Sequence, residues 1–409
     1  MNALYEIINL PKDKRAEMGV EYTPSEIAAQ PRLWVENFET LKKQKNEILD
    51  FLAKNVFSKL NARVILTGAG SSAHVGLSVQ NLLRFMWQLD VDTRPTTDIV
   101  THWDSIFLKN ADNVLVSFAR SGNSPESMAA IEIAEMFCPK ISHIVVTCNK
   151  DGATAQFSRK RRNALLILLS EETNDKGLAM TASFTTMLMT AQFLAYIKNL
   201  NEYEKIIKSI SEITQTLFDN YSSLIKDIAN TEFERAVFLG SGCLYGCAVE
   251  SALKLQEMTD GKIICKADTF LGVRHGPEAV VNDKTLVVYF LSSDPFVRKY
   301  ELDLMKEIKD KDLGMTKLVV CDKLGNEAAE NVDQSLEFDR EGKFKVPDPC
   351  RPLVDVTVGQ MLGLFKSLAI GLKPDNPSVK GVINRVVKGV KIYHHKTLTK
   401  TTCKKALSP

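Results

Sequence analysis

The amino-acid sequence predicts an α/β protein in which two parallel sheets follow one another along the chain, each flanked by helices in three αβα layers of the flavodoxin-like type. The first observation is a β-branched run, residues 62–67, which is followed by GAGSS (68–72) and then by a helix-like segment. The second is that residues 113–137, NVLVSFARSGNSPESMAAIEIAEMF, repeat this order of strand, turn and helix. The third is that the order recurs in the second half of the chain. Strands that alternate with helices form parallel sheets covered on both faces.

The two halves of the chain carry matching motifs at a nearly constant separation. Equivalent positions lie between 171 and 174 residues apart. A constant separation indicates a duplicated unit, whereas chance matches of short apolar strings would scatter. The matching pairs are Gly68 with Gly240, Leu115 with Leu286, Cys148 with Cys321, and Met187 with Met361.

Helical patterns precede and connect the two units. Thr23-Pro24-Ser25-Glu26 resembles a helix N-terminus, Gln30-Pro31 is expected to break the helix, and residues 34–57 continue with helical spacing. Near the other end, residues 382–393 alternate in a strand-like way. The expected divisions are a helical extension (1–44), a first α/β domain (45–200), a helical linker (201–230), a second domain (231–380), and a C-terminal segment with a basic tail (381–409).

Composition restricts the class of protein. The chain has 409 residues, of which 44% are hydrophobic and 25% charged, as expected for a soluble protein of two domains. Its net charge of +2 predicts no broad basic surface for nucleic acid. The longest apolar stretch, residues 164–169, is too short for a membrane span, and the first residues resemble no signal peptide. We expect a cytoplasmic protein without a nucleic-acid or membrane partner.

Cysteine usage points the same way. The eight cysteines are scattered through apolar runs, which is typical of small core residues in a reducing compartment. Cys243 and Cys247 have no second close pair to complete a metal site. The sequence predicts neither a bound metal nor a disulfide framework.

Two turns in the first half have the composition of anion-binding loops. Small residues and hydroxyls at a helix N-terminus let backbone N–H groups point at a phosphate. Alternatively, each turn is only a capped helix start, but the presence of both in one half favours phosphate binding. The candidate residues are Gly70, Ser71 and Ser72 in the first turn, and Ser121, Gly122, Asn123 and Ser124 in the second.

The second half carries side chains suited to moving protons. Glu250, Lys254 and Glu257 lie at i, i+4 and i+7 of a helix-like segment, so they share one side. His275 follows on a loop that Gly276-Pro277 stiffens. Carboxylate, ammonium and imidazole together can shuttle protons on a sugar. The alternative is a salt-bridged solvated face with a loop histidine, and spacing alone leaves both open.

Several motifs resemble those of sugar isomerase (SIS) domains, which bind phosphosugars. GAGSS and SGNSPES resemble the family's phosphate loops, and ALKLQEM…RHGP resembles the isomerase half of glucosamine-6-phosphate synthase. The chain is similar to a double-SIS protein over about residues 45–390. FARSGNSPES, NDKGLAMTASFTTM, DTFLGVRHGPEA and DNPSVKGVINRVV resemble the AgaS-type galactosamine-6-phosphate deaminase/isomerases, also described as tagatose-6-phosphate ketose/aldose isomerases.

The resemblance implies roles for individual residues. Ser72, Ser121 and Ser124 match positions that hold the sugar phosphate. Glu257 matches the carboxylate that moves a proton between C1 and C2, and His275 the histidine that opens the sugar ring from a neighbouring subunit. Lys254 matches a catalytic lysine near the substrate. Further substrate contacts are expected at Arg120, Glu250, Arg274 (in place of a family lysine) and Lys388 (a weaker match).

The implied reaction converts galactosamine-6-phosphate to tagatose-6-phosphate and ammonia by ring opening, proton transfer from C2 to C1, and imine hydrolysis. It needs no metal or organic cofactor. The resemblance also implies a homodimer or homotetramer whose subunits share active sites. No amidotransferase domain with an N-terminal cysteine nucleophile precedes the two units, so glutamine-dependent synthesis is not implied.

Three other functions are compatible with parts of the sequence. One is a glucosamine-6-phosphate deaminase or another aldose–ketose phosphate isomerase. Another is a phosphosugar-binding regulator without catalysis, although Glu257 and His275 argue for chemistry. The last is a nicotinamide oxidoreductase, because Gly68-x-Gly70-x-x-Ala73 follows a strand and either Asp90 or Asp92 supplies a distant acid. That fingerprint explains neither SGNSPE nor the duplication.

Overall fold

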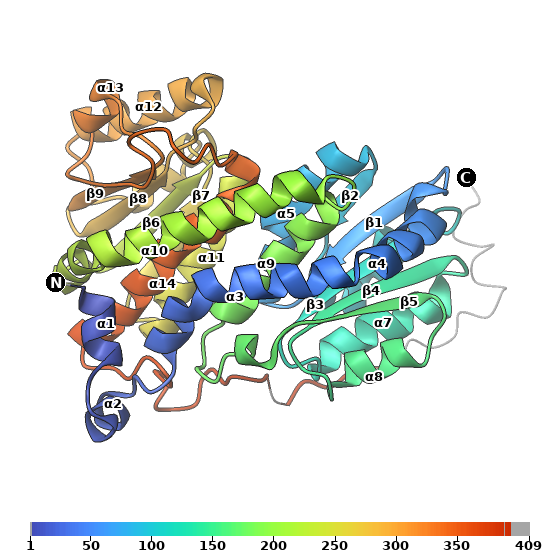
Figure 1. The fold of residues 1–409 in the computed structure, drawn as a ribbon. Coiled ribbons are helices and arrows are strands. Elements are labelled where there is room, and N and C mark those ends of the chain that lie inside the picture. The colour runs from blue at the N-terminus through green and yellow to red at the C-terminus, as the bar shows by residue number, and fades with distance from the viewer. Residues whose placement is uncertain (1, 388, 394–409) are drawn as a thin grey trace, which may run out of the picture.

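The computed structural model describes residues 2–387 and 389–393 and contains two five-stranded parallel sheets (Figure 1). The first has the order β2-β1-β3-β4-β5, and the second has the corresponding order β7-β6-β8-β9-β10. The predicted α/β fold with two tandem units is therefore confirmed. The strands of the first sheet are β1 (Ala62–Thr67), β2 (Asp90–Thr93), β3 (Asp112–Ala119), β4 (Ile141–Thr147) and β5 (Ala164–Leu168). Those of the second are β6 (Arg235–Gly240), β7 (Ile264–Asp268), β8 (Thr285–Phe290), β9 (Thr316–Cys321) and β10 (Gln334–Glu337).

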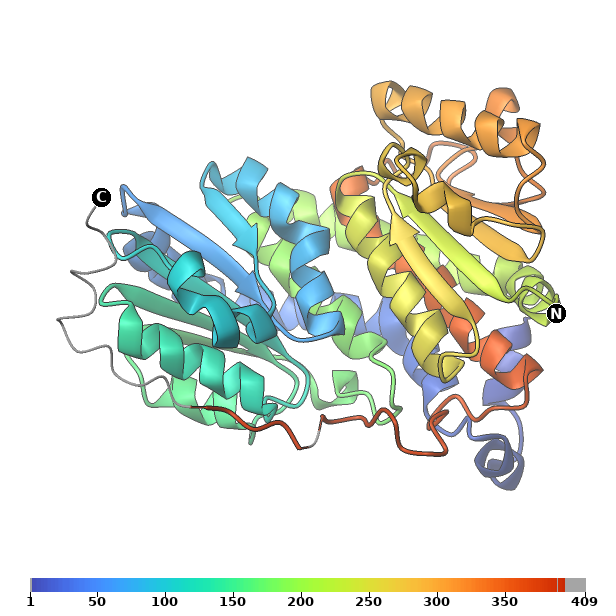
Figure 2. The same ribbon diagram turned by 180° about the vertical axis from the view of Figure 1, so that it is seen from behind.

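Helices cover both faces of each sheet and also fill the space between the sheets (Figures 1 and 2). Those up to the end of the first unit are α1 (Ala3–Ile8), α2 (Lys12–Met18), α3 (Thr23–Lys43), α4 (Lys45–Leu52), η1 (Ala53–Phe57), α5 (Ser71–Trp87), α6 (Thr96–Ile106), α7 (Pro125–Phe137), α8 (Ala153–Arg159), η2 (Glu171–Thr173) and α9 (Ala182–Ala195). Those that follow are α10 (Leu200–Asn230), α11 (Cys243–Met258), η3 (Gly272–Arg274), η4 (Pro277–Val280), α12 (Pro295–Asp310), α13 (Asn326–Ala329), η5 (Asp348–Cys350) and α14 (Pro352–Ala369).

The duplication extends to backbone conformation. β1 and α5 are joined by a turn in which Gly70 has a φ of 56°, and β6 and α11 by a turn in which Gly242 has a φ of 58°. Positive φ at this point favours glycine, because a Cβ would crowd the backbone. The two turns are therefore copies of one structure, separated by 172 residues as the sequence predicts.

The inner faces of the two sheets share one hydrophobic core. Val64 and Leu66 of β1 belong to the same buried cluster as Phe238 of β6, together with residues of α5, α9, α11 and α14. The alternate residues Ile65 and Val237 lie in two separate clusters on the outer faces. Side chains of successive strand residues point to opposite faces, so each sheet has its own outer core and both contribute to a common centre.

Helix α3 continues through Pro31, so the predicted break at Gln30-Pro31 is wrong. A proline in a helix cannot donate to the carbonyl four residues earlier, which here belongs to Ile27. The side-chain Nε2 of Gln30 donates to that carbonyl instead, at 3.0 Å. Gln30 also donates to Gln360 at 2.7 Å and accepts from Thr185 at 2.7 Å. The helical segment expected over residues 34–57 is in fact divided into the end of α3, α4 and the π-turn η1.

The strand-like prediction for residues 382–393 is also wrong, because the described residues of this range form no strand. The chain after α14 instead runs along the first unit without regular structure (Figure 2); we call residues 375–387 the C-terminal strap. Asp375 accepts hydrogen bonds from the backbone of Tyr22 and Thr23, at 3.0 and 2.7 Å. Arg385 donates to the carbonyl of Asp175 at 2.7 Å. The strap is held by side chains and loops rather than by a sheet edge.

Replacing Gln30 by leucine should destabilise the protein. The change leaves the carbonyl of Ile27 and the amide oxygen of Gln360 without their donor, and buried unsatisfied groups of this kind cost about 1–3 kcal/mol each. We expect the free energy of unfolding, measured by urea denaturation, to fall by at least about 2 kcal/mol. The matched control is Gln156→Leu, at an exposed glutamine, which should change it by less than about 0.5 kcal/mol. Equal effects of the two variants would contradict this account.

Candidate active site

A small cavity lies between the N-termini of α5 and α7. Its volume is about 100 Å³, and four of the predicted phosphate-binding residues line it, namely Ser72, Ser121, Gly122 and Ser124. Ser124 is the N-cap of α7, where its side chain accepts from the backbone N–H of Ser127 at 3.3 Å. Helix N-termini carry partial positive charge and unpaired N–H groups, so this cavity suits an anion.

The other predicted phosphate-binding residues have different surroundings. Gly70 makes the tight turn before α5, and the hydroxyl of Ser71 faces α11 rather than the cavity. The side chain of Asn123 accepts from the backbone of Ala153 at 2.9 Å and so begins α8. The buried guanidinium of Arg120 donates to the carbonyl of Leu178 at 3.1 Å and to that of Arg385 at 2.5 Å. Arg120 therefore fastens the C-terminal strap beside the cavity.

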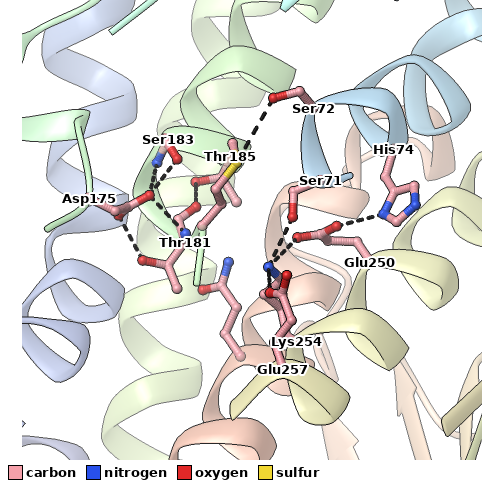
Figure 3. Close-up of polar contacts among 12 residues, drawn as sticks. Ser71, Ser72, His74, Asp175, Thr181, Ser183, Thr185, Glu250, Lys254 and Glu257 are labelled. Carbon is pink, nitrogen blue, oxygen red and sulfur yellow. Dashed lines mark hydrogen bonds and ion pairs between the residues drawn. The ribbon is translucent and has the colours of Figure 1, made fainter. Parts of the chain in front are cut away.

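Lys254 connects the two units at the packing of α11 against α5 (Figure 3). Its Nζ donates to Ser71 Oγ at 2.9 Å and to Glu257 Oε2 at 2.5 Å, and it lies 3.3 Å from Glu250 Oε1. The side chains of Lys254 and Glu250 have no exposed surface, whereas Glu257 is 25% exposed. The alternative of a solvated salt-bridged face is therefore wrong. Lys254 and Glu250 lie inside the protein, and Glu257 is partly open to solvent.

The charges in this cluster stabilise one another. Burial alone would lower the pKa of Lys254, but the carboxylates of Glu250 and Glu257 raise it above its ordinary value. Burial alone would raise the pKa of Glu250, but the ammonium of Lys254 and a hydrogen bond from His74 lower it. A buried charge is tolerated only when it is paired and hydrogen-bonded. The two carboxylates therefore favour the charged form of Lys254 beside Glu257.

His74 is a member of this cluster that the sequence analysis missed. It lies in the first turn of α5, and its Nδ1 is 2.8 Å from Glu250 Oε2. The cavity also has lining residues beyond those predicted: Ser127, Met180, Arg385, Val386 and Val387. The sequence contained clues to these residues. His74 lies three residues after Ser71, and Ser127 lies three residues after Ser124. The remaining lining residues, Met180, Arg385, Val386 and Val387, lie within motifs that carried the resemblance. Their convergence depends on packing between distant segments.

Arg274 and His275 lie apart from this cluster in the single chain. Arg274 forms an ion pair with Glu307 of α12 at 2.8 Å. His275 is exposed between η3 and η4, and within the described residues no hydrogen bond or ion pair joins its side chain to Glu257. The predicted substrate contact Lys388 lies outside the described residues.

The corresponding loop of the second unit is occupied by a carboxylate of the protein itself. Asp294 and Pro295 begin α12 as Ser124 and Pro125 begin α7. Asp348 accepts from the hydroxyl of Ser292 at 2.5 Å and from the backbone of Ser293 at 3.0 Å. The buried Arg351 pairs with Asp348 at 3.0 Å and with Asp355 at 2.9 Å. A carboxylate of the protein therefore accepts hydrogen bonds from this loop, whereas the corresponding loop of the first unit borders a cavity.

Both acids named for the nicotinamide alternative form ion pairs with arginines. Asp90 pairs with Arg63 and Arg84, at 3.1 and 2.8 Å. Asp92 pairs with Arg63 and Arg94, at 3.5 and 2.8 Å. Across residues 2–387 and 389–393 there is no group of three His, Cys, Asp or Glu side chains placed to hold a metal. No helix in the same part of the chain has the length and apolarity to cross a bilayer.

The repeated sheet order defines a duplicated α/β protein, and its first unit holds a hydroxyl-lined cavity at two helix N-termini. Residues 57–197 match the model of the SIS domain. D-galactosamine-6-phosphate deaminase AgaS of Escherichia coli is 37% identical over 381 residues, which cover 91% of this chain and 95% of that protein. The Streptomyces coelicolor relative, a putative enzyme of the same name, is 36% identical over 375 residues.

Solved structures agree. Tagatose-6-phosphate ketose/aldose isomerase from Escherichia coli matches with a TM-score of 0.83 and 32% identity, over 91% of this chain and 97% of that chain. A Clostridium novyi structure matches with a TM-score of 0.92 and 38% identity, over 95% and 99% of the two chains. This chain belongs to the AgaS family of double-SIS proteins.

A carboxyl cluster fixes the loop beside the cavity. Glu26 of α3 accepts from the backbone of Lys176 at 2.6 Å and of Gly177 at 3.3 Å. Burial, and then the nearby Asp175 and Asp375, raise the pKa of Glu26 to about 8. Glu26 therefore takes up a proton on folding at neutral pH.

This proton uptake should make stability depend on pH. Between about pH 4.5 and 8 the unfolded chain releases the proton of Glu26 before the folded protein does, so stability should fall as pH rises through this range. In Glu26→Gln this contribution is absent, and the decline of the melting temperature from pH 5 to pH 8.5 should be smaller than in the wild type. The exposed Glu47→Gln serves as control. An unchanged decline in Glu26→Gln would refute the assignment.

Proposed function

We propose that this chain is an amino-sugar phosphate deaminase that converts D-galactosamine-6-phosphate to tagatose-6-phosphate and ammonia. The names of its relatives, D-galactosamine-6-phosphate deaminase and tagatose-6-phosphate ketose/aldose isomerase, support this substrate and product. The observation that carries the proposal is the position of Lys254, which bonds both to Ser71 of the phosphate loop and to Glu257. The general base is thereby held next to the anion pocket.

In this proposal the substrate phosphate binds in the cavity between α5 and α7. The hydroxyls of Ser72, Ser121 and Ser124 donate to its oxygens, and the two helix N-termini add their partial positive charge. Binding energy from the phosphate, remote from C1 and C2, orients the reacting carbons. Arg120 contributes by holding the strap that forms one wall of the cavity.

Glu257 then acts as the base on the open-chain sugar. It accepts the proton of C2, the C–H electrons form the C1–C2 double bond, and the π electrons of the C1 carbonyl move to its oxygen, which takes a proton from water. Glu257 returns its proton to C1 as the nitrogen lone pair forms the C2=N bond, and the resulting iminium releases a proton to water, which leaves a ketimine at C2. Water adds to that carbon and ammonia departs, giving the ketose phosphate. The ammonium of Lys254 lies 2.5 Å from Glu257. In this proposal it stabilises the negative charge that develops on the C1 oxygen as Glu257 takes up the proton.

Ring opening is proposed to depend on a second copy of the chain. His275 is exposed and can therefore face a neighbouring subunit in a homodimer or homotetramer, while the adjacent Arg274 is ion-paired with Glu307. Imidazole can both donate and accept a proton near neutral pH, as ring opening requires.

The seven described cysteines are all free, which supports the proposal of a reducing cytoplasmic location.

The main test is incubation with galactosamine-6-phosphate and, in parallel, glucosamine-6-phosphate, with ammonia and ketose phosphate as readouts. We expect both products from the galacto sugar. Glu257→Gln should reduce turnover by at least about 100-fold, because general-base catalysis contributes that much, while the Kd for the sugar phosphate, measured by calorimetry, stays close to that of the wild type. Ammonia only from the gluco sugar would change the substrate, and binding without turnover would indicate a regulator.

Ser72→Ala should weaken binding of the phosphate. Among the residues that the structure describes, this hydroxyl has a single long contact, to Met180 Sδ at 3.9 Å, so its removal costs the fold little. A hydrogen bond to a charged group contributes about 1.5–3 kcal/mol, so KM should rise at least about tenfold with kcat largely retained. The exposed Ser105→Ala is the control. A wild-type KM in Ser72→Ala would place the phosphate elsewhere.

A further inference from the structure

His74 contacts the buried end of the candidate active site from the opposite unit (Figure 3). Its Nδ1 lies 2.8 Å from Glu250 Oε2, while the other carboxylate oxygen faces Lys254 at 3.3 Å. The side chain of His74 is 18% exposed and that of Glu250 is fully buried. Because the carboxylate of Glu250 is an acceptor, Nδ1 carries the proton and donates it.

The duplication shows that helix packing does not require this contact. At the 172-residue separation, His74 corresponds to Gly246 and Ser78 corresponds to Glu250. The equivalent contact between α5 and α11 is therefore that of Ser78 with Gly246. There a Cβ on Gly246 would lie 2.4 Å from Ser78 Oγ and 2.5 Å from Ser78 N. Backbone therefore packs directly against a small side chain there. The same pair of helices holds an imidazole and a carboxylate only on the side of Lys254 and Glu257.

His74 also has few other electrostatic partners. Of the elements packed against α5, α9 contains no titratable side chain. The acids of β2, Asp90 and Asp92, pair with arginines, and Asp348 of η5 pairs with Arg351. Glu250 is thus the charged group that faces His74 directly within the described chain, and Lys254 follows behind it.

We propose that His74 is a positioning residue for the deaminase reaction, an inference that rests on the proposed function. By donating to Oε2 it fixes the Glu250 carboxylate, whose Oε1 then faces Lys254. Lys254 in turn holds the base Glu257 at 2.5 Å. Without this donor, the buried carboxylate has to satisfy Oε2 in another way, and the ammonium of Lys254 shifts with it. The chain of contacts thus carries orientation from the first unit to the base on the second.

The test compares His74→Leu with His74→Asn, because the asparagine amide can place a donor where Nδ1 lies. On galactosamine-6-phosphate, His74→Leu should lose kcat by at least about tenfold, as is typical when a partner that orients a catalytic group is removed, with little change in KM. His74→Asn should recover most of the loss. The matched control is His102→Asn, at an exposed histidine of α6, which should behave as wild type.

The outcomes separate the two proposals. A wild-type protein that releases no ammonia from either amino sugar phosphate overturns the proposed function, whatever the variants do. An active wild type with unchanged kcat in His74→Leu overturns the role of His74. An asparagine variant as impaired as the leucine variant overturns positioning, because a donor alone would then be insufficient. A kcat loss in His74→Leu that tracks its loss of folded protein, measured by melting temperature, overturns it as well.

Discussion

The packing of α5 against α11 is the constraint on which the candidate site depends. Each helix follows the first strand of its unit, and each begins at a glycine with positive φ. Gly246 allows α11 to approach the backbone of Ser78 closely. This approach brings Lys254 to Ser71. The candidate phosphate loop of one unit and the Glu250–Lys254–Glu257 cluster of the other thereby become neighbours.

The duplicated units have taken different roles by filling equivalent places differently. In the first unit the loop before α7 borders an open cavity, whereas in the second unit Asp348 accepts from Ser292 and Ser293 in the corresponding loop. Burying two ionised groups is costly unless each is fully paired. The pairing of Asp348 with Arg351 and of Lys254 with Glu250 offsets part of that cost. The first pair lies beside the loop of the second unit, and the second pair lies beside Glu257 at the candidate site.

Much of the architecture was predictable because it rests on local patterns. Alternating strands and helices, the near-constant separation of the repeats, and the hydroxyls before α5 and α7 are visible in the chain itself. Two local predictions were wrong because side-chain hydrogen bonds override the backbone preference. The side chain of Gln30 replaces the hydrogen bond that Pro31 cannot make, and Arg385 and Asp375 fasten the strap where alternation suggested a strand.

The sequence by itself determined the fold class, the duplication, and the residue types from which a phosphosugar site is made. These follow from periodicity and turn chemistry, which act over a few residues. Only the tertiary structure decided that Lys254 and Glu250 are buried, that Ser71 faces Lys254 rather than the cavity, and that His74 reaches Glu250. Those contacts join residues more than 170 positions apart, and their geometry depends on how closely two helices approach.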